Sequence, residues 1–213
     1  PGGELAIVPG ASCRDGAGIP DVMRGEETQL AGALHSGDGR VLAVLPGTHS
    51  KWALVEQGKL VAFATFMTGE LYAVLLEHSI LGRMADRGAP SAAMAGTAFG
   101  RGVARGLGGG GLTHLIFGAR TLALAGELAP AEVGDLLSGV LIGDEVRAAD
   151  SWAQERGGRI APVRVIGDDA WVALAGSFAL FVGLVGAGVA ATSALRLWPL
   201  AVPSSFDEVW SAY

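Results

Sequence analysis

Cysteine, charge and basic residues are scarce in this sequence. A single cysteine, Cys13, occurs among its 213 residues, which excludes a disulfide framework and suggests a reducing compartment. Charged residues make up 17% of the chain and the net charge is −6 with no basic stripe, so we expect no nucleic-acid partner. The sequence has no G-x-x-x-x-G-K-[ST] phosphate loop and no set of His, Cys and acidic residues with zinc-ligand spacing.

A secretory signal is also lacking. The chain starts at Pro1 without a charged n-region and an apolar h-region, so we expect a cytoplasmic protein and a trimmed segment of a longer one. Residues 170–195 carry no charge, and this run is long enough to span a bilayer. Three interpretations are open: a helix buried between lobes, an altered reading frame, and a membrane span with Trp171 and Trp198 near its ends. We favour the first two.

Half of the residues are apolar, which is typical of a globular protein with a buried core. Hydrophobic periodicity predicts the following elements, with a polar, Gly-rich loop at 12–20. Strands are expected at 5–8, 41–45, 52–55, 60–66 and 160–166, and helices at 26–35, 71–81, 91–106, 112–125 and 130–152. The strands between 41 and 66 are joined by short Gly-containing connections, which predicts a three-strand antiparallel meander. A meander followed by helices and a further strand favours an α/β layer fold.

The first turn of the meander, at 46–51, is the sharpest local signal. Gly47 and Thr48 allow backbone N–H groups and a hydroxyl to approach an anion closely, and Lys51 adds a point charge. His49 lies in the same turn and can donate to a phosphate oxygen. An ordinary hairpin turn is the alternative.

A second polar signal precedes the first predicted helix. Arg24, Glu26, Glu27 and Thr28 crowd into residues 22–29. A kinase that acts on an alcohol needs a carboxylate to accept the hydroxyl proton and a cation to hold an acidic substrate. The alternative is a helix whose first turn is acidic because acids suit the positive end of the helix dipole.

Together these segments resemble the 2-dehydro-3-deoxygalactonokinase family. The likeness is carried by VMRGEETQLAGA (22–33), VLPGTHSKW (44–52), FMTGELYAVLLEHSILG (66–82) and LLSGVLIGDEV (136–146). The order and spacing of these stretches are also similar, so the resemblance covers about residues 5–168.

The resemblance implies a ribonuclease-H-like lobe of the actin-like ATPase, or sugar kinase, fold. Residues 1–38 would then be a remnant of the N-terminal lobe with an interlobe segment. Residues 39–195 would form the C-terminal ATP-binding lobe, and residues 196–213 a divergent tail.

The activity implied by the resemblance is ATP-dependent phosphorylation of 2-dehydro-3-deoxy-D-galactonate to its 6-phosphate, with Mg²⁺. The partners would be ATP and the sugar acid, and a homodimer is a candidate assembly. Glu26 resembles the catalytic base of related carbohydrate kinases, with Glu27 as a competitor. The other implied site residues are Arg24, Glu27 and Thr28 for the substrate, and Gly47, Thr48, His49, Lys51, Gly167 and Asp168 for ATP.

Two departures from the family affect these expectations. Nothing before Glu26 matches the family's first phosphate loop, which also helps to hold magnesium, so we expect residues 1–213 alone to be inactive and assign no metal ligand. After Asp169 the apolar run replaces the family's more polar helix. Another kinase of the same superfamily and a membrane-anchored, non-catalytic binding module are the alternatives.

Overall fold

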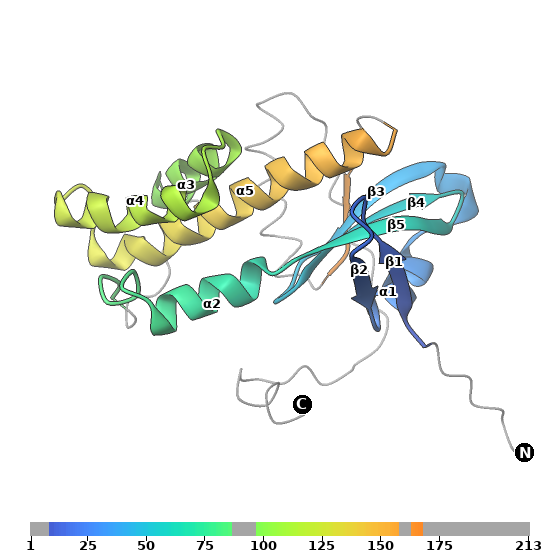
Figure 1. The fold of residues 1–213 in the computed structure, drawn as a ribbon, viewed down its shortest axis with the longest axis horizontal. Helices are drawn as coiled ribbons and strands as arrows, with labels where there is room; N and C mark the ends of the chain where they lie inside the picture. The colour runs from blue at the N-terminus through green and yellow to red at the C-terminus, as the bar shows by residue number, and fades with distance from the viewer. Residues whose placement is uncertain (1–8, 87–96, 158–162, 168–213) are drawn as a thin grey trace, which may run out of the picture.

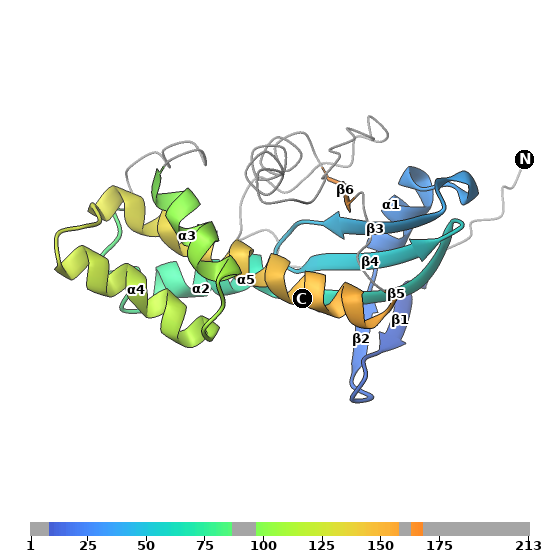
Figure 2. The same ribbon diagram turned by 90° about the horizontal axis from the view of Figure 1, so that it is seen from above.

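The computed structural model describes residues 9–86, 97–157 and 163–167. Its elements are β1 (Ala11–Arg14), β2 (Pro20–Met23), α1 (Glu26–Ala33), the short 3₁₀ helix η1 (Ser36–Asp38), β3 (Arg40–Leu45), β4 (Ser50–Glu56), β5 (Lys59–Phe66), α2 (Thr68–His78), α3 (Thr97–Leu107), α4 (Leu112–Leu124), η2 (Pro130–Glu132), α5 (Val133–Glu155) and β6 (Val163–Val165). The strands gather at one end of the described part and α2, α3 and α4 at the other (Figure 2). The predicted α/β class is confirmed.

A four-stranded mixed sheet, in the order β5-β4-β3-β6, is the larger of the two sheets. The predicted meander is confirmed, because β3 and β5 both pair antiparallel with β4. Strand β6 is part of the strand expected at 160–166 and pairs parallel with β3, with Val165 opposite Val44. The helices expected at 26–35, 112–125 and 130–152 are confirmed to within a few residues at their ends.

The loop predicted at residues 12–20 is confirmed only at 15–19, because residues 12–14 and Pro20 belong to strands. Strands β1 and β2 form an antiparallel hairpin there, with Ser12 opposite Val22. Its turn is closed by Asp15, whose Oδ1 accepts hydrogen bonds from the main-chain N–H groups of Ala17 (2.9 Å) and Ile19 (2.8 Å). Each strand has only four residues, and Ala11 and Cys13 are covered by the distant main sheet, so the local sequence did not reveal these strands. The strand expected at 5–8 lies outside the described residues.

The two faces of the sheet carry separate cores. Alternate residues of β3 face opposite sides, as strand geometry requires. Val41, Ala43 and Leu45 pack with the β1–β2 hairpin and α1, whereas Leu42 and Val44 pack with the second half of α5. Figure 1 shows α5 crossing the strands on one side and α1 lying on the other.

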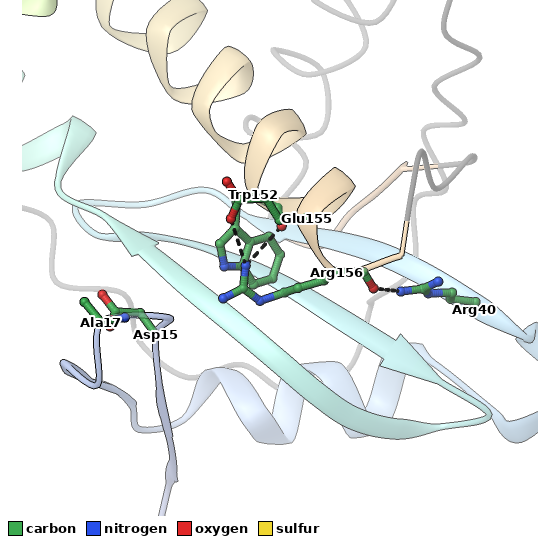
Figure 3. A network of polar contacts seen from close by, with 6 residues as sticks. All are labelled: Asp15, Ala17, Arg40, Trp152, Glu155 and Arg156. Carbon is green, nitrogen blue, oxygen red and sulfur yellow. Dashed lines mark hydrogen bonds and ion pairs between the residues drawn. The ribbon is translucent and has the colours of Figure 1, made fainter.

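Arg40 of β3 ties the C-terminal end of α5 to the sheet, and a second arginine, Arg156, packs within the helix end (Figure 3). The guanidinium of Arg156 lies 4.7 Å from the ring centroid of Trp152, a cation–π contact. Arg40 of β3 donates to the main-chain carbonyls of Arg156 and Gly157, the latter at 3.2 Å, and so satisfies acceptors at the helix end. Arg40 therefore adds a polar link between β3 and the end of α5 to the apolar packing between them.

The first half of α5 packs closely on α3 through glycines. The four glycines at the crossing are Gly102 and Gly106 on α3 and Gly139 and Gly143 on α5. A Cβ at Gly139 would overlap the main chain of α3, lying 2.9 Å from the Val103 nitrogen. The helices therefore approach at a distance that excludes any side chain at these positions.

Replacing Gly139 by alanine tests this packing. We expect Gly139→Ala to lower the free energy of unfolding by about 1–3 kcal/mol, because two helix backbones must move apart. Gly32→Ala on α1 is the matched control, since nothing described lies within 4 Å of its Cβ position. It should be neutral or stabilising by about 0.5–1 kcal/mol, as expected for Gly→Ala in a helix. Urea titration measures both, and equal effects of the two changes would contradict the packing.

Candidate functional site

The carboxyl ends of the two parallel strands meet at one edge of the sheet. Strand β3 leads into the β3–β4 turn (residues 46–49), and β6 leads into Gly167. The Ile166 N–H donates to the Val44 carbonyl at 2.9 Å, so Gly167 lies beside the start of the turn. Two segments predicted to bind ATP are thereby brought to the same edge, where ligands of α/β sheets commonly bind. Asp168 lies outside the described residues.

The first turn of α2 packs directly against the β3–β4 turn. The Glu70 N–H donates to the Thr48 carbonyl at 3.0 Å. A Cβ at Gly69 would lie 2.7 Å from the Gly47 oxygen and 2.8 Å from the Thr48 Cα, so this approach requires glycine. The carboxylate of Glu70 also pairs with His49 Nε2. His49 therefore faces α2. The sequence had predicted instead that His49 donates to a phosphate oxygen.

Gly47 is a glycine that the described fold does not require. Its backbone is outside the left-handed region, and no described atom lies within 4 Å of the position a Cβ would take. The side of the turn toward which a Gly47 Cβ would point is thus uncovered by described residues, while Gly69 lies against the Gly47 carbonyl and Thr48 on the other side.

A buried carboxylate lies under this edge. Glu145 of α5 is 7% exposed, and its Oε1 accepts a hydrogen bond from Trp52 Nε1 at 2.7 Å. The side chains of Thr68 and Ser50 also hydrogen-bond to it. Burial raises the pKa of Glu145, and the hydrogen bonds from Thr68, Trp52 and Ser50 act in the opposite direction with a smaller effect.

On the opposite face of the sheet, a chain of hydrogen bonds joins β4, β5 and β2. Lys51 is buried at 6% exposure, and its Nζ donates to Thr65 Oγ1 at 2.9 Å. The Thr65 hydroxyl and main-chain N–H in turn donate to the carboxylate of Asp21, at 2.6 and 2.7 Å. The predicted phosphate ligand Lys51 is thereby linked to the strand that leads into the RGEET segment (residues 24–28).

Within the RGEET segment, the acids bind main chain. Gly25 precedes α1 with φ of 108°, a conformation that favours glycine, and lets β2 turn into the helix. Glu26 accepts from the Arg24 N–H at 3.0 Å, and Glu27 from the Gly25 N–H at 2.7 Å. The Thr28 hydroxyl donates to the Gly25 carbonyl at 2.5 Å. The side chains of Arg24 and Thr28 are exposed.

The structure therefore joins some predicted site residues and leaves others apart. Gly47, Thr48, His49 and Gly167 share one edge, and Lys51 lies at the start of β4. In the described part of the chain, no hydrogen bond or ion pair connects the RGEET segment directly to the β3–β4 turn; the connection runs through Asp21, Thr65 and Lys51.

Sequence reasoning did not assign Asp21, Thr65, Ser50, Thr68 or Glu145 to the site. For Glu145 a signal existed. It is the acidic member of a stripe of α5 residues spaced four apart, and such a stripe faces one side of a helix. The other members of the stripe are apolar and buried: Leu137, Leu141, Ala149 and Ala153. Asp21 has no such signal, because its contact with Thr65 joins residues far apart in the chain.

Candidate metal ligands do not cluster among the described residues. In residues 9–86, 97–157 and 163–167, no three His, Cys, Asp or Glu side chains gather as metal ligands. Two acids around the β3–β4 turn are engaged by protein groups, Glu145 by three donors and Glu70 by His49. Within the same ranges, no helix has the length and apolar character to cross a membrane. The apolar run at 170–195 lies outside them.

The fold and the sequence match a class of known proteins. The structure is similar to a crystal structure from Sinorhizobium meliloti assigned as a 2-dehydro-3-deoxygalactonokinase, with a TM-score of 0.73 and 35% identity over 86% of this chain and 58% of the other. The family model described as 2-keto-3-deoxy-galactonokinase matches residues 1–197. The chain therefore belongs to the 2-keto-3-deoxy-galactonokinase family.

Two curated relatives carry the same function in their names. The probable 2-dehydro-3-deoxygalactonokinase of Rhizobium meliloti (strain 1021) is 42% identical over 148 residues, 68% of this chain. The 2-dehydro-3-deoxygalactonokinase of Escherichia coli (strain K12) is 39% identical over 145 residues, again 68% of this chain. The chain spans about half the length of these relatives, since the matches cover 48% of each.

The buried carboxylate predicts a pH dependence of stability. Because the pKa of Glu145 is raised in the folded state, the folded chain holds this proton more tightly than the unfolded chain. The wild type should lose stability as pH rises from about 4 through the raised pKa. Glu145→Gln, which cannot ionise, should lack that loss.

Urea titrations of both proteins between about pH 4 and pH 8 measure the effect. The difference in unfolding free energy should shift in favour of Glu145→Gln as pH rises, and other titrating groups cancel in that difference. A difference independent of pH would contradict a raised pKa for this carboxyl.

Proposed function

We propose that this chain provides the nucleotide-phosphate side of a sugar-acid kinase that phosphorylates 2-dehydro-3-deoxygalactonate with ATP. The named function of the curated relatives supports the substrate and the reaction. The observation that carries the proposal for this chain is the β3–β4 turn, with its uncovered glycine beside Gly167 at the carboxyl edge of the parallel strands.

The proposed fold is a ribonuclease-H-like lobe of the actin-like ATPase type, spanning residues 39–195. The antiparallel meander and the parallel strand β6 beside its first strand support this. Residues 1–38 would be the remnant of a preceding lobe, and 196–213 a divergent tail. A cytoplasmic location, a homodimer and a requirement for Mg²⁺ remain predictions.

Phosphate binding would use main-chain groups first. The N–H groups of Gly47 and Thr48 would face the phosphates on the uncovered side of the turn, where a glycine lets an anion come close. His49 borders the same turn. Lys51 is held by Thr65, but an ammonium has three donors, and those not used by Thr65 can serve a phosphate oxygen. Gly167, and Asp168 beyond it, would lie against the adenosine.

The transfer itself needs a base and an anchor for the acid substrate. The acceptor hydroxyl oxygen would form a bond to the γ-phosphorus as the bond from that phosphorus to the β,γ-bridging oxygen breaks and ADP leaves. Glu26 would take the hydroxyl proton, with Glu27 as the competitor. Arg24 would bind the substrate carboxylate and Thr28 its hydroxyl groups, since both side chains are exposed.

Blocking the turn tests nucleotide binding. Gly47→Val should weaken ATP binding by at least about tenfold, or roughly 1.4 kcal/mol of binding free energy. The reason is that the new side chain takes the space of the phosphates. The fold should be unaffected, since the position is open. Calorimetric titration of residues 1–213 with ATP measures this. Gly37→Val, at another open glycine, is the matched control and should bind like the wild type. Equal binding by both variants would remove the turn from the site.

Replacing Glu26 and Glu27 in turn by glutamine tests which of them is the general base. Residues 1–213 alone are predicted to be inactive, so the assay uses a chimera in which this chain replaces the matching segment of the E. coli relative. Glu26→Gln should slow ATP-dependent phosphorylation of 2-dehydro-3-deoxygalactonate by roughly 10²- to 10⁴-fold, the usual loss of a general base. Glu27→Gln is the matched control and should cost less than about tenfold. The reverse order would transfer the role to Glu27, and no loss in either would exclude both.

A further inference from the structure

Glu145 has no part in the proposed chemistry, yet it organises the elements around the phosphate turn. Its carboxylate accepts hydrogen bonds from three side chains on two different elements. Trp52 and Ser50 belong to β4, and Thr68 is the first residue of α2. Glu145 itself lies on α5, so one carboxylate ties three elements together.

Burying the Glu145 carboxylate lowers the free energy of unfolding, so its presence calls for a role other than stability. Taking a carboxylate out of water is unfavourable, and an apolar residue of similar size would often pack at least as well. The neighbours of Glu145 in the buried stripe of α5 are apolar, including Leu141 at 3% exposure and Ala149 at 0%. The burial that raises the pKa of Glu145 reflects the same cost.

The geometry that Glu145 fixes is that of the β3–β4 turn. Ser50 is the residue directly after the turn, and Thr68 directly precedes Gly69 and Glu70. Those two residues make the close contacts with Gly47 and Thr48. Glu145 therefore holds the exit of the turn and the helix start that covers its far side.

We propose that Glu145 is a positioning residue for nucleotide binding, which holds the β3–β4 turn against α2 through Ser50 and Thr68. The inference rests on the proposed function, because it assumes that phosphates bind this turn. Glu145 acts on ATP affinity and leaves the binding of the sugar acid unchanged, since the RGEET segment lies on the α1 side of the sheet.

Two measurements on residues 1–213 test the proposal. Calorimetry measures ATP affinity, and hydrogen exchange measures protection of the Glu70 amide, which donates to Thr48 and so reports the contact between turn and helix. Glu145→Leu should weaken ATP binding by at least about tenfold and speed exchange of the Glu70 amide. Glu145→Gln keeps an acceptor and should lose less. Thr68→Val, a milder change that removes one donor, should shift both measurements in the same direction even if Glu145→Leu folds poorly.

Asp144→Asn is the matched control, because it alters the neighbouring carboxylate, which pairs with Arg147. It should leave both measurements at wild-type values. If ATP binds the wild type and neither Glu145→Leu nor Thr68→Val changes affinity, the positioning role is wrong and the proposed function stands. If the wild type binds no ATP while the Glu70 amide responds to Glu145→Leu, the nucleotide site is wrong, and the carboxylate holds the turn without the proposed consequence for binding.

Discussion

The approach of α2 to the β3–β4 turn is the contact on which the rest of the candidate site depends. Gly69 brings the helix within van der Waals distance of the turn backbone, and the Glu70 N–H closes the contact on the Thr48 carbonyl. With one side of the turn covered in this way, its uncovered side lies at Gly47, beside Gly167. A short hairpin turn on its own would have no such fixed face, because exposed turns move more than the elements that they connect.

The three residues after the turn connect it to both sides of the sheet. Successive side chains of a strand point to opposite faces, so Ser50 and Trp52 reach Glu145 on α5, whereas Lys51 reaches Thr65 on the side of the β1–β2 hairpin. Thr65 passes that connection to Asp21. We therefore expect a substitution at Glu145 or at Asp21 to change the position of the β3–β4 turn and so its binding of phosphates.

Local sequence patterns predicted the elements that have local causes. The meander has Gly-containing turns between apolar runs, and α5 has a long apolar stripe after Pro130, so both were found. The β1–β2 hairpin was not found, because Cys13 and its neighbours gain their burial from the distant sheet, including a bond from the Cys13 thiol to the Phe63 carbonyl. In the site, residue types predicted Gly47 and Thr48, but the partners of Lys51 and the role of Glu145 depend on tertiary contacts.

The central claim is that the main chain of the β3–β4 turn binds nucleotide phosphates. Amide NMR spectra of isotopically labelled residues 1–213, recorded during titration with a non-hydrolysable ATP analogue, test it most directly. The account predicts that the largest, saturable shifts occur at the amides of Gly47, Thr48 and Gly167. Saturable shifts confined to other parts of the chain, with these three amides unmoved, would contradict it.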